Sequence, residues 1–138
     1  MNDYSFEDLY IGLKESFTVT VTEEMLEGFL KLTGDINPLH TDGEFARARG
    51  YEDRVAYGML TSSFLSTLAG VYLPGKRSLI REVNVLFKKP VYVGNTLTVS
   101  GEVTSLDADF NIFEMKVTIC NEEGVKVLRG KMQMGVLG

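Results

Sequence analysis

The stretch VAYGMLTSSFLSTLAGVYLPG, Val55–Gly75, contains no charged residue. Its apolar side chains fall on several faces of a helix, and serines and threonines stand between them. A helix that lacks a charged, solvated face is typically a buried one. The hydroxyl groups and the closing Pro74-Gly75 turn make the stretch a poor membrane span. We therefore predict a long helix with no solvated face, which other parts of the chain must cover.

Strand-like runs follow this stretch and supply that cover. Turn residues separate the runs, and apolar and polar residues alternate along three of them, Thr96–Leu106, Asn111–Asn121 and Val125–Val136. A period of two with one polar face indicates antiparallel strands that are buried on one side. Asp107-Ala108-Asp109 and Asn121–Gly124 fit the connecting turns of a meander. The predicted strands are Leu79–Phe87, Thr96–Leu106, Asn111–Asn121 and Val125–Val136.

The part of the chain before the uncharged stretch predicts one more strand and two helices. Ser16–Thr22 alternates with β-branched residues, as a strand does. An apolar stripe then predicts a helix that Thr22 caps and that Gly34 ends. Asp42 is a good cap for a short helix over Gly43–Ala48. A strand, helices and then antiparallel strands give an α+β fold.

Between these helices lies GDINPLH, Gly34–His40, which predicts an ordered turn. Pro38 removes a backbone donor and disfavours the helical conformation at the residue before it. His40 is the only histidine in the chain, and Asp35 precedes it on the same turn. With ordinary pKa values of about 6.5 and about 3.9, an imidazole and a carboxylate held together can act as an acid–base pair. A turn that merely satisfies its own backbone, with an exposed histidine, is the alternative.

Several short motifs together resemble the MaoC-like acyl dehydratases, which include the (R)-specific enoyl-CoA hydratases. They are Gly34–His40, Phe45-Ala46, Gly58–Leu60 and Phe87–Asn95, so that the resemblance runs over most of the chain. It implies a hot-dog fold, in which a curled antiparallel sheet wraps a long central helix. It also implies a homodimer or higher homo-oligomer that forms by pairing of edge strands, with acyl tunnels near the subunit interface.

The reaction that this resemblance implies is the addition of water to a 2-enoyl thioester, or the reverse dehydration of a 3-hydroxyacyl thioester. Asp35 and His40 would hold the water between them, with Asp35 as the principal base. Gly58 stands at the expected start of the central helix, where its free N–H would stabilise the thioester oxygen. Asn37 would help to orient the pair. The thioester would be carried by CoA or by an acyl carrier protein.

One residue departs from the family pattern, and several others have two interpretations. Tyr57 stands where the family has the histidine of a His-Gly-Met element. Because the proposed oxyanion donor is a backbone N–H, this change leaves the core mechanism intact. Ser62 and Ser63 either reach the active site or bond back to helix carbonyls. Four cations could bind CoA phosphates or a carrier protein, or could simply be solvated: Arg77, Arg81, Lys88 and Lys89.

Composition excludes several other classes of protein. With 138 residues the chain is most simply a single domain, residues 1–138. A net charge of −5 argues against nucleic-acid and anionic-membrane partners. One histidine and one cysteine leave no metal cluster, and no dinucleotide or P-loop motif is present, so no cofactor is expected. The lone Cys120 and an N-terminus without signal-peptide character predict a cytoplasmic protein.

Two other functions agree with the same fold. Some hot-dog proteins are acyl-CoA thioesterases, which release a free thiol from saturated acyl-CoA. The Asp35–His40 pair argues against that activity. A non-catalytic acyl-thioester binding module is the other alternative, and Tyr57 leaves room for it.

Overall fold

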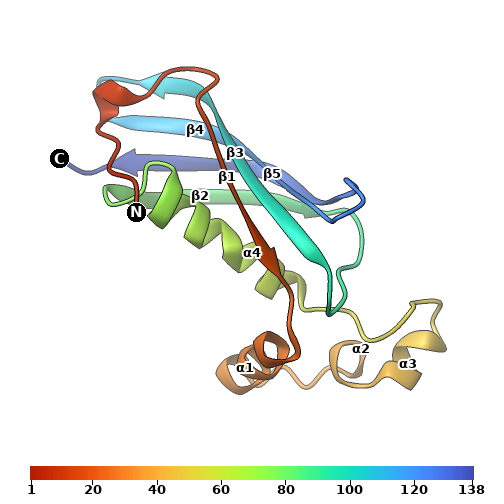
Figure 1. The fold of residues 1–138 in the computed structure, drawn as a ribbon. Helices are drawn as coiled ribbons and strands as arrows, with labels where there is room; N and C mark the ends of the chain where they lie inside the picture. The colour runs from red at the N-terminus through yellow and green to blue at the C-terminus, as the bar shows by residue number, and fades with distance from the viewer.

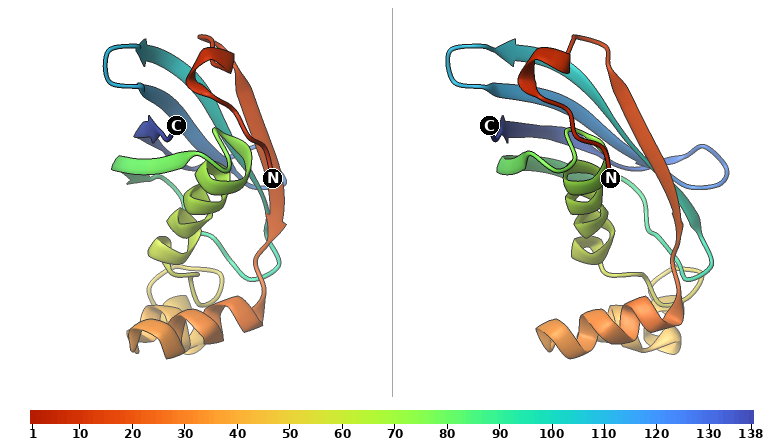
Figure 2. Two further views of the ribbon diagram at one scale, coloured as in Figure 1. Left: turned by 90° about the vertical axis from the view of Figure 1, so that its left-hand side faces the viewer. Right: turned by 60° about the vertical axis from the view of Figure 1, so that its left-hand side comes forward.

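The computed structural model describes all 138 residues, and it consists of a curled antiparallel sheet with a helix against its inner face (Figure 1). The helix is α4 (Gly58–Thr67), which continues as a short π-helix, η2 (Leu68–Tyr72). Figure 2 shows the sheet curving over this helix. The strands are β1 (Lys14–Thr20), β2 (Ser78–Phe87), β3 (Thr96–Asp107), β4 (Ile112–Cys120) and β5 (Lys126–Val136). This is the hot-dog arrangement that was predicted.

The five strands lie in the order β1-β3-β4-β5-β2, and all of the pairs are antiparallel. Strands β3, β4 and β5 form the predicted meander, and β1 from the N-terminal part of the chain pairs with β3. Strand β2 crosses to the far edge and pairs with β5 instead of with β3, its successor in the chain. The period of a strand sets which side chains face inward, but it does not identify the partner strand.

The inner face of the sheet forms the core together with α4 and η2. The alternation predicted for three strands is confirmed, because their inward-facing side chains are almost completely buried. Leu60, Leu65 and Leu68 meet them from the helical side. The buried strand residues include Leu97, Val99, Val103, Phe113, Met115, Val117, Ile119, Leu128, Met132 and Met134.

The prediction of a helix with no solvated face is wrong for the single chain. Met59 is 66% exposed, and Ser66 and Thr67 are also exposed. The reason is geometrical, since one sheet covers only one side of α4. The helix is also shorter than the uncharged stretch, because it begins at Gly58. No helix of the structure has the length and apolar character that crossing a membrane requires.

Three further helices lie together at one end of the molecule, near the start of α4 (Figure 1). They are α1 (Glu23–Thr33), α2 (Pro38–Thr41) and α3 (Gly43–Arg47). The predicted caps are confirmed: the Thr22 hydroxyl accepts from the Met25 N–H, Gly34 adopts the left-handed conformation, and Asp42 caps α3. The turn predicted over Gly34–His40 is correct only in its first half. From Pro38 the chain is helical, since proline suits a first helical position.

Candidate active site

Two short segments meet at the start of α4, and three hydrogen bonds join them. The Tyr57 hydroxyl donates to the backbone oxygen of Asp35 at 2.8 Å. The Val55 N–H donates to the Leu39 oxygen at 3.0 Å, and His40 Nδ1 lies 2.7 Å from the Val55 oxygen. The segment Asp35–His40 is therefore held directly against the segment Val55–Gly58. The two segments thus bring groups from different parts of the sequence together at the start of α4.

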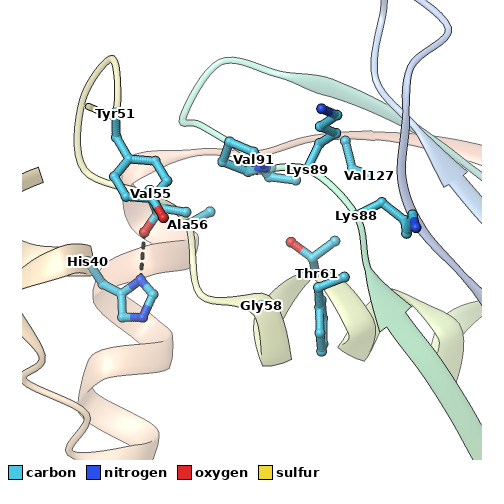
Figure 3. Close-up of a pocket in the computed structure, with 12 residues that line it drawn as sticks. His40, Tyr51, Val55, Ala56, Gly58, Thr61, Lys88, Lys89, Val91 and Val127 are labelled. Carbon is cyan, nitrogen blue, oxygen red and sulfur yellow. Dashed lines mark hydrogen bonds between the residues drawn. The ribbon is translucent and has the colours of Figure 1, made fainter. Parts of the chain in front are cut away.

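The contact between His40 and Val55 determines which ring nitrogen of His40 is reactive (Figure 3). A carbonyl oxygen can only accept a hydrogen bond, so Nδ1 must carry a proton and donate it. In the neutral imidazole, Nε2 then has a free lone pair. The His40 ring also packs on the Tyr57 ring, with 4.3 Å between their centroids. His40 is thus fixed in both tautomer and orientation, with Nε2 available for chemistry.

The carboxylate of Asp35 is held by its own turn. Its Oδ1 accepts from the Asn37 N–H at 3.1 Å, and Asn37 Oδ1 accepts from the Leu39 N–H at 2.9 Å. The Asn37 side chain therefore caps α2, and it is the backbone of Asn37 that contacts Asp35. The second carboxylate oxygen of Asp35 has no hydrogen-bond partner in the protein. It is free to bind a water molecule or a ligand.

Two neighbouring cavities surround these groups. The smaller has a volume of about 170 Å³ and contains Asp35 and His40 in its wall. The larger has a volume of about 290 Å³, and Lys88 and Lys89 contribute to its lining. Both cavities are lined by His40, Gly58 and Phe87, so they meet at the start of α4. Asp35 and His40, predicted from one motif, and Gly58, predicted from another, are brought together here, and Asn37 lines neither cavity.

Gly58 combines two properties that suit it to an anionic oxygen. It is the first residue of α4, and its N–H donates to no group of the protein. The N-terminal end of a helix also carries partial positive charge. A Cβ on Gly58 would lie 3.2 Å from Cε1 of Phe87, so the space above its backbone is open only because glycine has no side chain.

Of the serines and cations that the sequence left with two interpretations, only the two lysines line a cavity of the site. The hydroxyls of Ser62 and Ser63 donate back to the carbonyls of Met59 and Leu60. Of their two interpretations, bonding to helix carbonyls is therefore the correct one. The Arg77 guanidinium donates to Asp3 at 2.7 Å. Lys88 and Lys89 line the larger cavity, and the N–H of each donates to the Val127 oxygen. Arg81 lines neither cavity.

Sequence reasoning missed Thr61 and the contacts of Tyr57. Thr61 lines the larger cavity, and the only signal for it is its position on the helix one turn after Gly58. Tyr57 is 2% exposed, and burial, reinforced by the negative charge of Asp35, raises the pKa of its hydroxyl. The hydroxyl therefore stays protonated and can serve as a donor at neutral pH.

Comparison with known proteins gives concordant results. A family model described as "MaoC like domain" matches residues 11–125. An (R)-specific enoyl-CoA hydratase from Aeromonas caviae is 34% identical over 92% of this chain and 95% of its own length. A second enzyme of that name, from Rhodospirillum rubrum, is 32% identical over 91% of this chain and 87% of its own length. The solved structure of an unliganded R-hydratase from Pseudomonas aeruginosa superimposes with a TM-score of 0.91, covering 98% of this chain and 86% of that one at 27% identity.

Proposed function

Because the chain belongs to the MaoC-like domain family, we propose that it is an (R)-specific enoyl-CoA hydratase, which in reverse acts as a 3-hydroxyacyl-thioester dehydratase. Enzymes that add water to a double bond are hydro-lyases, the class of the curated relatives. The observation that carries the proposal is that Asp35, His40 and Gly58 line one cavity. No cofactor is needed, because water addition only transfers protons and forms a C–O bond.

In the proposed mechanism, Asp35 and His40 Nε2 each accept a hydrogen bond from one water molecule. Asp35, as the principal base, takes a proton while the water oxygen bonds to the β-carbon of the enoyl group. The electrons of the double bond move onto the thioester oxygen, and the free Gly58 N–H stabilises the resulting enolate. The acid–base pair then returns one proton to the α-carbon. The water is consumed, and both side chains recover their starting protonation states.

The two cavities supply a place for each end of the substrate. We place the phosphopantetheine arm, which CoA and acyl carrier protein share, in the larger cavity beside Lys88 and Lys89. The reactive carbons then reach the point where the cavities meet. The acyl group extends into the smaller cavity, past Met59 and Phe29.

We propose that residues 1–138 form a single domain that assembles as a homodimer through β2. This strand is an edge of the sheet, and an unpaired edge is a template for pairing. Its apolar side chains are unusually exposed in the single chain, with Leu86 at 53% and Phe87 at 51%. Since Phe87 lines both cavities, a partner at β2 would help to enclose the site. The free thiol of Cys120 suits the reducing cytoplasm, where we place the enzyme.

The proposed function is tested by following the loss of enoyl-thioester absorbance with crotonyl-CoA. Wild type should turn over, and Asp35→Asn and His40→Ala should each lose about 10²-fold or more in kcat. Asp109→Asn, the same chemical change in the exposed turn after β3, is the matched control and should behave as wild type. Equal hydration by wild type and Asp35→Asn would contradict the mechanism. Thiol release from saturated acyl-CoA would indicate a thioesterase, and binding without turnover would indicate a binding module.

A further inference from the structure

Thr61 differs from the other helical hydroxyl residues near the site. It is 3% exposed, and no other serine, threonine, asparagine, glutamine or charged residue of the protein is buried. The hydroxyls of Ser62 and Ser63, and also that of Thr41, donate to helix carbonyls within the preceding turn. The Thr61 hydroxyl has no hydrogen-bond partner in the protein, although the Tyr57 carbonyl lies one turn back and accepts the Thr61 N–H.

An unpartnered hydroxyl is costly to bury, so its position needs a reason. No fully buried side-chain polar atom of this protein lacks a partner, which means that the Thr61 hydroxyl keeps contact with open space. That space is the larger cavity, which Thr61 lines. Figure 3 shows the hydroxyl of Thr61 directed into the cavity beside Gly58, with His40 on the other side of the helix start.

The geometry of the helix directs Thr61 toward Gly58. Residues three apart lie on the same face of an α-helix, and their Cα–Cβ bonds tilt toward the helix N-terminus. The Thr61 hydroxyl therefore leans toward the end of α4 at which the Gly58 N–H is free. The Gly58 N–H and the Thr61 hydroxyl, neither of which has a partner in the protein, therefore belong to residues that both line the larger cavity.

We propose that the Thr61 hydroxyl is a second hydrogen-bond donor to the thioester carbonyl oxygen, acting together with the Gly58 N–H. This inference rests on the proposed function. During hydration, negative charge develops on that oxygen, and a donor fixed in a site with little water stabilises the charge more than it stabilises the neutral thioester. Thr61 would thereby lower the barrier as well as hold the substrate. Of the other side-chain donors of the cavity, His40 already gives its Nδ1 proton to Val55, and Lys88, Lys89 and Tyr51 are exposed.

Kinetics of three variants test the proposal. Thr61→Val removes the hydroxyl and keeps the shape, and should lower kcat/KM for crotonyl-CoA by about 10- to 100-fold. Thr61→Ser keeps a donor and should stay within about fivefold of wild type. Thr18→Val makes the same change at an exposed position on β1 and should have no effect. Wild-type kinetics in Thr61→Val, or equal losses in Thr61→Ser and Thr61→Val, would overturn the proposal.

Thermal unfolding separates this role from a structural one. Because the hydroxyl has no partner in the protein, replacing it with a methyl group should leave Tm unchanged or raise it. A loss of activity that is accompanied by an equal loss of folded protein would indicate a structural residue and would overturn the proposal.

A measurement without turnover distinguishes failure of this inference from failure of the proposed function. The infrared carbonyl band of isotope-labelled butyryl-CoA, which is saturated and cannot be hydrated, reports hydrogen bonding to the thioester oxygen. Binding to wild type should shift the band to lower frequency, and Thr61→Val should reverse part of that shift. This result would support the Thr61 contact even if crotonyl-CoA were not hydrated. An identical shift in both proteins, or no bound band in wild type, would overturn it.

Discussion

The Tyr57 hydroxyl donates a hydrogen bond to the backbone oxygen of Asp35, and the ring of the same residue packs against His40. The ring of Phe29 in α1 also packs against the Tyr57 ring, with 4.7 Å between the two centroids. One buried side chain therefore touches both members of the proposed acid–base pair. We propose that Tyr57 positions the pair through these two contacts.

Tyr57→Phe tests this positioning role. The variant keeps the ring and its packing but loses the bond to Asp35, so we expect kcat to fall by about tenfold while KM changes by less than about twofold. The free energy of unfolding should fall by about 1 kcal/mol, as for a typical hydrogen bond. Tyr10→Phe, at a tyrosine that is 60% exposed, is the control. If kcat is unchanged in Tyr57→Phe, the hydrogen bond does not position Asp35.

Gly58→Ala places a methyl group in the space reserved for the thioester. The added Cβ would lie 3.2 Å from Phe87, whose half-exposed ring can move, so stability should change by less than about 1 kcal/mol. Activity should fall by about 10²-fold, because a small displacement of the reacting group is enough to misalign it. Gly28→Ala in α1, where the methyl group meets nothing within 4 Å, should retain activity and gain about 0.5–1 kcal/mol. Full activity in Gly58→Ala would remove Gly58 from the oxyanion site.

Replacing both Lys88 and Lys89 with alanine tests where the carrier binds. If these cations contact the phosphates of CoA, KM for crotonyl-CoA should rise by about fivefold or more, equivalent to about 1 kcal/mol. The rise should disappear at high salt, since exposed charges are screened. Crotonyl N-acetylcysteamine, which lacks phosphates, should show no difference, and the exposed Lys76→Ala serves as the protein control. Equal losses with both thioesters would point to a change in cavity shape.

We expect the stability of the protein at alkaline pH to depend on Tyr4. Its hydroxyl donates to Glu15 at 2.7 Å, and this bond, together with burial, raises the pKa of Tyr4 from 10.0 to about 12. A raised pKa in the folded state means that the stabilisation is complete below the unfolded value and is lost as pH increases toward the folded value. The free energy of unfolding, measured by urea titration, should therefore fall between about pH 10 and about pH 12. Tyr4→Phe and Glu15→Gln should each reduce that fall, and an unchanged slope in both would contradict the assignment.

The elements of the fold could be predicted because their signals are local. Alternation identified the inward-facing residues of three strands, and the side chains of Thr22 and Asp42 marked the helix starts. The pairing of β2 with β5 could not be predicted, because no local pattern records a partner strand. The exposed side of α4 was missed for a related reason. An uncharged surface looks the same in sequence whether its own chain covers it or not.

For the site, the sequence identified residue types better than it identified contacts. Asp35, His40 and Gly58 were found through motifs that resemble one family, and they line one cavity. The contacts that tie them together depend on the packing of Asp35–His40 against Val55–Gly58, two segments that are separated along the chain. For that reason neither the Tyr57 bond to Asp35 nor the open hydroxyl of Thr61 could be derived beforehand.

The two segments that these hydrogen bonds join lie outside the sheet. They are at the end of the molecule where α1, α2 and α3 lie (Figure 1). Residues Asp35–Pro38 are exposed, whereas Val55, Ala56 and Tyr57 are buried, and two of these belong to the core. An exposed segment with few buried contacts can open without unfolding the whole domain. On heating, the joint between Asp35–His40 and Val55–Gly58 should therefore open before the sheet melts, so that the enzyme becomes inactive while its strands are still intact. The temperature at which the enzyme loses activity would then be set by the contact between these two segments. Mutations that rigidify this contact would raise that temperature without changing the packing of the core.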